Sequence, residues 1–290
     1  MSIKIYFLLF CSMLAVSTSP LIARHLDNMV DPISIAFWRM LLGTIILTVY
    51  GYFTSNIKLI SSKNFLKTVL AGILLGLHFS LFYGAISLLP DNIPNATVFG
   101  TLAPLFALFI EIYFGRKIDK KIYFGLSIIL CGSFLIFIDN FSFNSDLTNG
   151  NILAILCSVC FACVFIISEQ VRRTDSALSF SRSIFFYASI TLLIIGFFMD
   201  ISFLNDKVFH NFHYLIFLGI VPTLIGHSVF YYLVKYLPPT AVASIPLGEP
   251  FIASTLAWVI FPGQIFNIYI ISGGLMTLIG LFVIIQSKKT

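Results

Sequence analysis

Charged side chains are scarce in this sequence, making up 10% of its 290 residues. About 25% of the residues of a soluble globular domain are charged, so the surface of a chain this poor in charge is not mostly exposed to water. Intrinsic disorder is excluded too, because 16% of the residues are aromatic and disordered chains are poor in aromatics. The few cysteines lie in apolar stretches and do not form the disulfide framework of a small secreted protein; they are Cys11, Cys131, Cys157, Cys160 and Cys163.

Further absences narrow the functional class. No glycine-rich phosphate loop ends in Lys-Ser/Thr, so ATP-driven transport by this chain is not expected. The net charge of +5 is modest and its basic residues are dispersed, which argues against a nucleic-acid partner. Neither His78 nor His227 has a second His or Cys at metal-ligand spacing. The sequence therefore predicts no metal and no cofactor.

Long hydrophobic runs are what the sequence does have, with 59% hydrophobic residues. A helix needs about 20 mostly apolar residues to span a bilayer, and continuous rather than alternating apolarity argues against a β-barrel. We predict an all-α integral membrane protein with ten transmembrane helices. The spans are 3–23, 33–54, 66–88, 93–114, 121–138, 151–169, 178–199, 213–234, 240–260 and 265–286, the first being a retained helix rather than a cleaved signal peptide.

The positions of Lys and Arg predict the orientation. With the N-terminus inside, 14 of the 17 basic residues fall in inside segments and two, Arg24 and Lys207, fall outside, while Arg39 lies within a span. Because basic residues favour the cytoplasmic side, we expect a multi-pass protein of the cell's inner (plasma) membrane with both termini cytoplasmic.

An internal repeat relates the two halves of the chain. Residues 82–90 match residues 230–238 in Phe, Tyr, Leu and Pro at a constant offset of 148. A histidine precedes each stretch, and an apolar helix with a proline follows each one, containing Pro104 or Pro250. Spans three and four thus pair with eight and nine, which predicts two five-helix repeats, residues 1–145 and 146–290. An odd number of spans inverts the second copy, as in many transporters.

These features resemble the EamA-like branch of the drug/metabolite transporter superfamily. The run from Ala241 to Ser244, followed by Leu247-Gly248-Glu249-Pro250, is similar to the family's small-residue run ending in Glu-Pro, and Phe37-Trp38-Arg39 resembles its aromatic-Arg step. The resemblance implies a central cavity lined by spans 1, 3, 4, 6, 8 and 9. The sequence departs from the family pattern in two ways. Gly115-Arg116 and Gly263-Gln264 stand where the family often has Gly-Glu, and Ala103 is the first-half counterpart of Glu249.

Polar residues inside spans are the candidate substrate-binding or coupling residues, because they are costly there. Glu249 could contact substrate or carry a proton, or it could be a protonated group bonded to a carbonyl freed by Pro250. His78 and His227 could bind a ligand or join helices. Arg39 could attract an anion, pair with an acid or snorkel. Trp38, Tyr83, Tyr231 and Tyr232 could line the cavity or pack, and Pro104 and Pro250 are expected to break their helices.

The function predicted from these features is secondary active transport of small metabolites, amino acids or related solutes, by alternating access coupled to protons or to exchange. The expected partners are the small-molecule substrate and membrane lipids, with the protein a monomer or a weak homodimer. The main alternative is a membrane-embedded enzyme acting on a lipid, for which His25, His210 and His213 would be the outer polar groups. A purely structural subunit would have no use for Glu249 or for an inverted repeat.

Overall fold

A computed structural model describes residues 3–26, 29–88, 98–138, 148–260 and 268–287. Within these ranges every regular element is a helix. The elements are α1 (Ile3–Ser17), α2 (Ser19–His25), α3 (Pro32–Phe53), η1 (Ser62–Asn64), α4 (Phe65–Leu88), α6 (Ala103–Tyr113), α7 (Lys120–Phe137), α8 (Thr148–Arg172), α9 (Ala177–Phe198), α10 (Asp206–His210), α11 (Phe212–Leu218), η3 (Gly219–His227), α12 (Ser228–Leu233), α13 (Pro239–Ala243), η4 (Ile245–Gly248), α14 (Glu249–Ile260) and α15 (Ile268–Ile285).

Among the described residues, eight helical stretches are long and apolar enough to cross a membrane, and they coincide with eight of the ten predicted spans. The fourth predicted span begins outside the described residues, and its described part is a shorter apolar helix, Val98–Tyr113. The fifth coincides with α7, an 18-residue helix that is not among the eight. The predicted boundary between the two halves, 145/146, lies outside the described residues.

Short polar residues fix where several spans begin. Asp31 accepts a hydrogen bond from the Ile33 amide (2.8 Å), and Pro32 occupies the first turn of α3, where its missing N–H costs nothing. Asp119 caps α7 by the same kind of bond, at 3.0 Å. Because side-chain oxygens satisfy amides that the helix itself leaves free, these caps place the span ends close to where hydropathy predicts them.

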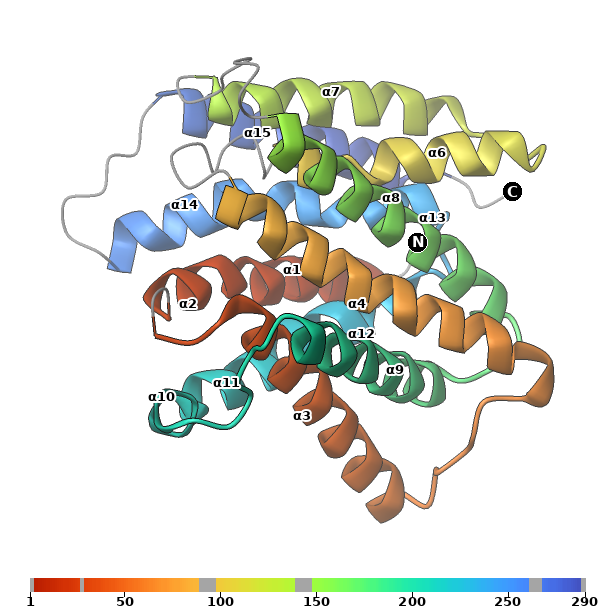
Figure 1. The fold of residues 1–290 in the computed structure, drawn as a ribbon. Helices are drawn as coiled ribbons and strands as arrows, with labels where there is room; N and C mark the ends of the chain where they lie inside the picture. Colours follow the sequence, from red (N-terminus) through yellow and green to blue (C-terminus); the bar gives the residue numbers. More distant parts are fainter. Residues whose placement is uncertain (1–2, 27–28, 89–97, 139–147, 261–267, 288–290) are drawn as a thin grey trace.

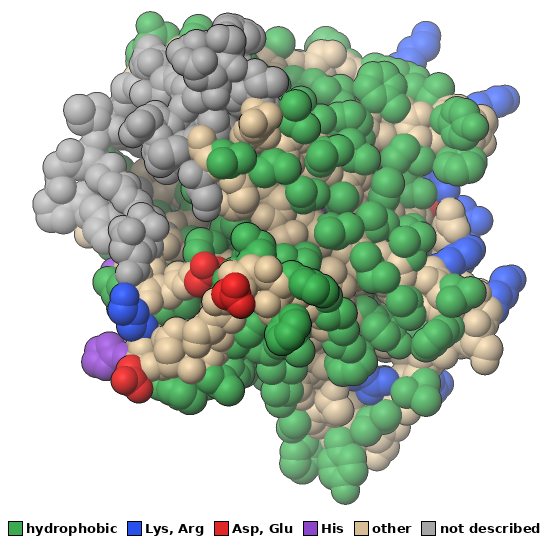
Figure 2. All heavy atoms as spheres, viewed as in Figure 1, with side chains coloured by type: hydrophobic (Ala, Val, Ile, Leu, Met, Phe, Trp, Pro, Cys, Tyr) green, Lys and Arg blue, Asp and Glu red, His purple; other side chains and the backbone are tan. Residues whose placement is uncertain are grey.

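The helices run back and forth between two ends of the molecule (Figure 1). Lys and Arg gather mainly at one end, while apolar side chains cover the surface between the ends (Figure 2). We call the end that carries Lys63, Lys67, Arg116 and Arg173 the basic end; α1 begins there and α15 ends there. Large apolar side chains such as Phe7, Phe109 and Phe197 are 65%, 61% and 76% exposed, as expected for a surface that faces lipid rather than water.

Glycines allow the closest helix contacts. A Cβ atom added to Gly132 on α7 would lie 2.5 Å from the carbonyl oxygen of Gly273 on α15, and one added to Gly125 would lie 2.6 Å from that of Gly280. Small residues let membrane helices approach this closely. The same holds for Gly72 on α4, whose added Cβ would meet the Tyr187 side chain of α9 at 2.3 Å.

Candidate functional site

Two phenylalanine rings organise a cluster of polar side chains between the helices. The Phe79 ring of α4 lies under the Arg39 guanidinium (4.8 Å from Cζ to the ring centroid) and 5.8 Å from the His227 ring. The Phe161 ring of α8 stacks on His78 at 4.2 Å and 20°, and its centroid is 5.8 Å from that of His227. We call these five residues the central cluster. Sequence reasoning missed Phe79 and Phe161, since neither stands out among 32 phenylalanines.

The backbone of α8 holds His78. The Nδ1 atom of His78 lies 3.1 Å from the carbonyl oxygen of Cys157 and 3.1 Å from the Cys157 sulfur. Because a carbonyl oxygen only accepts, Nδ1 donates in the first contact and the ring carries its hydrogen there. Together with the stack on Phe161, this bond fixes the orientation of the imidazole.

His227 is placed by an unusual backbone. Residues Gly219–His227 form a π-helix that contains Pro222, between α11 and α12. π-helical segments occur frequently at functional sites. The His227 ring is buried, and its Nδ1 has no hydrogen-bond partner among the described residues. The hydroxyl of Tyr231, one turn further along, is likewise buried without a partner in that part of the chain. Buried polar atoms are normally satisfied, so this side of the cluster has spare hydrogen-bonding capacity.

Arg39 is buried, with 2% of its surface exposed. Its Nε donates to Thr223 Oγ1 (3.3 Å) and its Nη1 to Ser19 Oγ (3.1 Å). The guanidinium also interacts electrostatically with Tyr83 and Glu249, but no direct ion pair joins Arg39 to a carboxylate among the described residues. A buried charge is costly without a counter-charge, so this arrangement favours an anionic group beside Arg39.

Glu249 is the first residue of α14 and is half-buried. The 3-10 turn η4 precedes it, so Pro250 stands in the first turn of a helix, and Pro104 likewise stands in the first turn of α6. Each proline was predicted to break its helix, and in the structure a new α-helix begins one residue before each of them, where a proline costs little because a first-turn N–H has no partner within the helix to lose. A carboxylate at a helix N-terminus is favoured by the helix dipole.

Two predicted site residues lie apart from the central cluster. Trp38 donates from Nε1 to the carbonyl of Phe203 (2.9 Å) and packs edge-on against Phe212. Tyr232 is partly exposed and contacts Tyr236, with ring centroids 5.1 Å apart. Tyr83 and Tyr231, in contrast, both interact electrostatically with Arg39. The structure thus brings six of the eight predicted side chains together, counting Glu249 through its charge interaction with Arg39.

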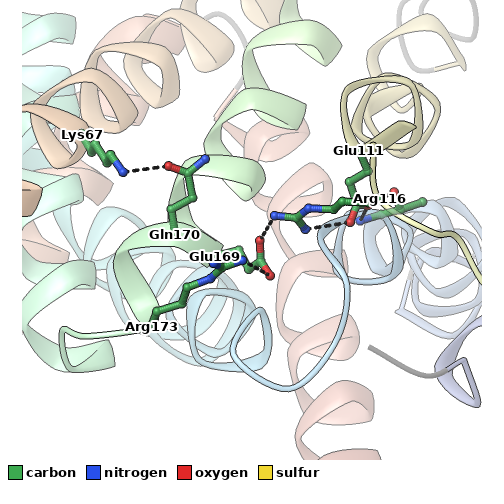
Figure 3. Close-up of polar contacts among 7 residues, drawn as sticks. Lys67, Glu111, Arg116, Glu169, Gln170 and Arg173 are labelled. Carbon is green, nitrogen blue, oxygen red and sulfur yellow. Dashed lines mark hydrogen bonds and ion pairs between the residues drawn. The ribbon is translucent and has the colours of Figure 1, made fainter. Parts of the chain in front are cut away.

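A second polar site lies at the basic end. A cavity of about 360 Å³ is lined by charged and amide side chains that include Lys63, Lys67, Glu111, Arg116, Gln170 and Arg173. Figure 3 shows how most of these side chains meet, with Lys67 donating to Gln170 Oε1 at 2.9 Å. Sequence reasoning did not single out this site, although an acid near the end of each of two apolar spans was a signal for it.

An ion-pair bridge forms one wall of that cavity. Arg116 donates from Nη1 to Glu111 (3.1 Å) and from Nη2 to Glu169 (2.5 Å), and Arg173 lies 3.6 Å from Glu169 (Figure 3). Burial lowers the pKa of Arg116, but its hydrogen bonds and charge interactions with Glu169 and Glu111 outweigh this and leave the pKa raised. Both carboxylates are 2% exposed, so Arg116 serves as the counter-charge for two buried acids.

No metal centre is evident in the part of the chain that the structure describes: no group of three or more His, Cys, Asp or Glu side chains could hold an ion there. The Cys157 contact gives His78 one sulfur neighbour and no further ligand of that kind.

Eight apolar spans around a polar, aromatic cluster define a multi-pass membrane protein. The sequence model of the EamA-like transporter family matches residues 3–138 and again residues 148–286. The chain therefore belongs to the EamA-like transporter family.

Two individual comparisons agree with this assignment. An "uncharacterized transporter" of Archaeoglobus fulgidus is 24% identical over 183 residues, which is 63% of this chain and 63% of the archaeal protein. A solved crystal structure superposes with a TM-score of 0.80 at 16% identity, covering 97% of this chain and 96% of the other. At that identity the structural similarity establishes the fold alone.

Proposed function

We propose that the protein is a secondary active transporter that moves small metabolites, amino acids or related solutes, across the cytoplasmic membrane by alternating access. The observation that carries the proposal is the buried Arg39, which lies over the Phe79 ring, interacts with the charge of Glu249 and has no carboxylate in direct contact among the described residues. Family membership and the two successive matches of the family model support it.

The charges of the site favour an amphoteric solute. Arg39 offers a cation to a carboxylate, and Glu249 offers an anion to an amine. Phe79 and Phe161 provide apolar surface beside Arg39 and His78. The free Nδ1 of His227 is available for a further hydrogen bond. A zwitterion satisfies both charges at once, whereas a neutral or purely cationic solute leaves Arg39 uncompensated.

Alternating access follows from the two halves. We take residues 1–145 and 146–290 to be inverted repeats, and we expect the helix interruptions at Pro104 and Pro250 to leave free backbone groups that line the transport path. Glu249 is the group we assign to proton coupling, with exchange of solutes as the uncoupled mode. We place both termini in the cytoplasm and the protein in the inner membrane, as a monomer or a weak homodimer surrounded by lipid.

The proposal is tested by comparing ligand binding and transport by the wild type and by an Arg39 variant. Purified protein is screened by thermal shift against zwitterionic, anionic, cationic and neutral small solutes, because a bound ligand raises the melting temperature. Solutes that stabilise the protein are then followed by counterflow in proteoliposomes. We expect zwitterions to stabilise the wild type, and Arg39→Gln to weaken their binding about tenfold to a hundredfold, as loss of a charged hydrogen bond predicts.

Arg182→Gln is the matched control, because Arg182 is also buried but bonds the carbonyl of Lys58, away from the cluster. Arg39→Lys, which keeps the charge, should retain part of the affinity. The proposal fails if no solute class is carried by the wild type, or if Arg39→Gln binds and carries zwitterions as well as the control does.

A further inference from the structure

The ion-pair bridge at the basic end connects the two halves of the chain. Glu111 and Arg116 belong to the first half, and Glu169 to the second. Glu111 also accepts hydrogen bonds from the backbone N–H of Thr240 (3.1 Å) and from its hydroxyl, and Thr240 lies in α13 of the second half. Thus α6, α8 and α13 are joined by charged hydrogen bonds at one point.

The bridge lies between the central cluster and the basic end. On α8, Glu169 follows Phe161 by eight residues, which is about 12 Å along the axis at 1.5 Å per residue. Phe165 lies between them, fully buried, with its ring 4.6 Å from Phe161 and 6.2 Å from Phe230 of α12. Beyond the bridge is the cavity that Glu111 and Arg116 line. An apolar layer and an ionic layer therefore separate that cavity from the cluster.

We propose that the Glu111–Arg116–Glu169 bridge is the gate of the transporter at its basic, cytoplasmic side. This proposal rests on the proposed function, because a gate has meaning only if the central site opens to each side in turn. Opening toward the basic end requires α6 to part from α8 and α13, which breaks the contacts of Arg116 with Glu169 and of Glu111 with Thr240. The cavity outside the bridge is then the vestibule through which solute passes.

The free-energy cost of separating these ions is low enough for the bridge to open and close. Two buried carboxylates share one guanidinium that is itself 23% exposed. Water from the cavity can solvate Arg116 when the bridge opens, so the cost of separating the charges is reduced relative to a fully buried pair. Arg173, 65% exposed and 3.6 Å from Glu169, is positioned to accompany that carboxylate after Arg116 leaves.

Cys157 serves as a native reporter of opening. Its thiol is buried beside His78 in the described structure, so a membrane-impermeant, charged thiol reagent reaches it only through an opened path. The experiment uses full-length protein with Cys11, Cys131, Cys160 and Cys163 replaced by alanine. Labelling rates are measured from the cytoplasmic side in inside-out vesicles and from the opposite side in right-side-out vesicles.

We expect Arg116→Gln to raise the cytoplasmic-side labelling rate about tenfold or more, as a population shift toward the open state. Loss of Arg116 alone removes a counter-charge from two buried acids and could loosen the fold for that reason. The triple change Glu111→Gln, Arg116→Gln and Glu169→Gln removes all three charges together and therefore tests the bridge without leaving an excess of buried negative charge. The matched control is Lys63→Gln, which removes one positive charge from the cavity but no described ion pair.

The gate is overturned if the triple variant labels at the wild-type rate from the cytoplasmic side. It is equally overturned if labelling accelerates to the same extent from both sides, since that reports general loosening. The readout requires no transported solute. A protein that carries nothing but still shows one-sided acceleration would therefore refute the proposed function while keeping the bridge as a one-sided conformational latch.

Discussion

At the scale of single residues, the two histidines of the central cluster are held differently, and this predicts different effects of removing them. His78→Leu loses a hydrogen bond to Cys157 and the stack on Phe161, and should cost about 1–2 kcal/mol of stability. His227→Leu loses no hydrogen bond at Nδ1 and should cost less than about 1 kcal/mol. Thermal unfolding in detergent measures both.

Transport measurements on the same two variants distinguish a structural role of His78 and His227 from a role in binding the solute. If both rings face the solute, each variant should lower flux per folded molecule about tenfold, the equivalent of roughly 1.4 kcal/mol. A His227→Leu protein that unfolds more readily than His78→Leu, yet carries solute normally, would mean that these rings serve packing alone.

Asp175 gives a prediction for acid stability. Burial raises the pKa of this carboxyl, but hydrogen bonds from Asn64 Nδ2 (2.5 Å), the Ser61 amide (2.8 Å), the Ser61 hydroxyl (2.9 Å) and Thr174 outweigh it, so the pKa is lowered overall. A lowered pKa means that the ionised form stabilises the fold above the unfolded pKa, about 3.9, and that this contribution is lost as pH falls through the folded pKa.

The test compares wild type with Asp175→Asn across pH. The wild type should be more stable near neutral pH by about 1 kcal/mol, a modest figure because the site is partly exposed, and the difference should shrink below about pH 4. Ser202→Ala, in an exposed loop, is the control. A difference that grows on acidification would contradict the lowered pKa.

How much of the site the sequence predicts depends on residue type. Arg39, His78, His227 and Glu249 were found because a polar group inside an apolar span is costly and so stands out. Phe79 and Phe161 form the centre of the cluster but look like any other phenylalanine until packing is known. Trp38 was singled out from a motif, but a motif does not say which way a ring points, and in the structure its Nε1 donates to the carbonyl of Phe203.

At the scale of elements, the glycine contact between α7 and α15 yields a stability prediction. Gly132→Ala places a Cβ 2.5 Å from the Gly273 carbonyl oxygen and 2.8 Å from Thr277 Oγ1. The helices must move apart, at a cost of about 1–3 kcal/mol. Gly84→Ala is the matched control, because its Cβ meets only Leu153 at 3.4 Å. Equal melting temperatures for the two variants would show that α7 and α15 do not pack this closely.

Hydropathy could not predict whether the backbone within a span is an α-helix or a π-helix. The span 213–234 was predicted as one apolar helix, whereas the structure divides it into α11, the π-helix Gly219–His227 and α12. A run of apolar residues has the same hydropathy whether its backbone is α or π. The π-helix packs against α1 and α3, which are contacts that hydropathy does not describe.

At the scale of the whole molecule, the distribution of Lys and Arg predicts the topology. Reporter domains fused after Lys67, Lys121, Arg173 and Thr290 should all report the cytoplasmic side, because basic segments are retained there. A fusion after Lys207, one of the two basic residues assigned outside, is the control and should report the opposite side. If any of the first four fusions reported the non-cytoplasmic side, the predicted ten-span topology would be wrong.

Spans and overall class were predictable because the bilayer imposes a length and a polarity on every crossing segment. The order in which spans pack is not encoded in hydropathy, so the meeting of α6, α8 and α13 at the Arg116 bridge emerged only in three dimensions. The departure at Gly115-Arg116 was visible in the sequence, but its consequence, a counter-charge for Glu111 and Glu169, was not.

Glu249→Gln in proteoliposomes provides the sharpest test of proton-coupled transport through Arg39 and Glu249. Glutamine keeps the shape and hydrogen bonding of a protonated glutamate but cannot release a proton. We expect accumulation of a zwitterionic solute driven by a pH gradient to disappear, while exchange at equal pH persists at higher solute concentrations, because the amide still accepts a hydrogen bond from the amine, and the variant remains folded. Unchanged gradient-driven accumulation across a range of pH values would contradict it.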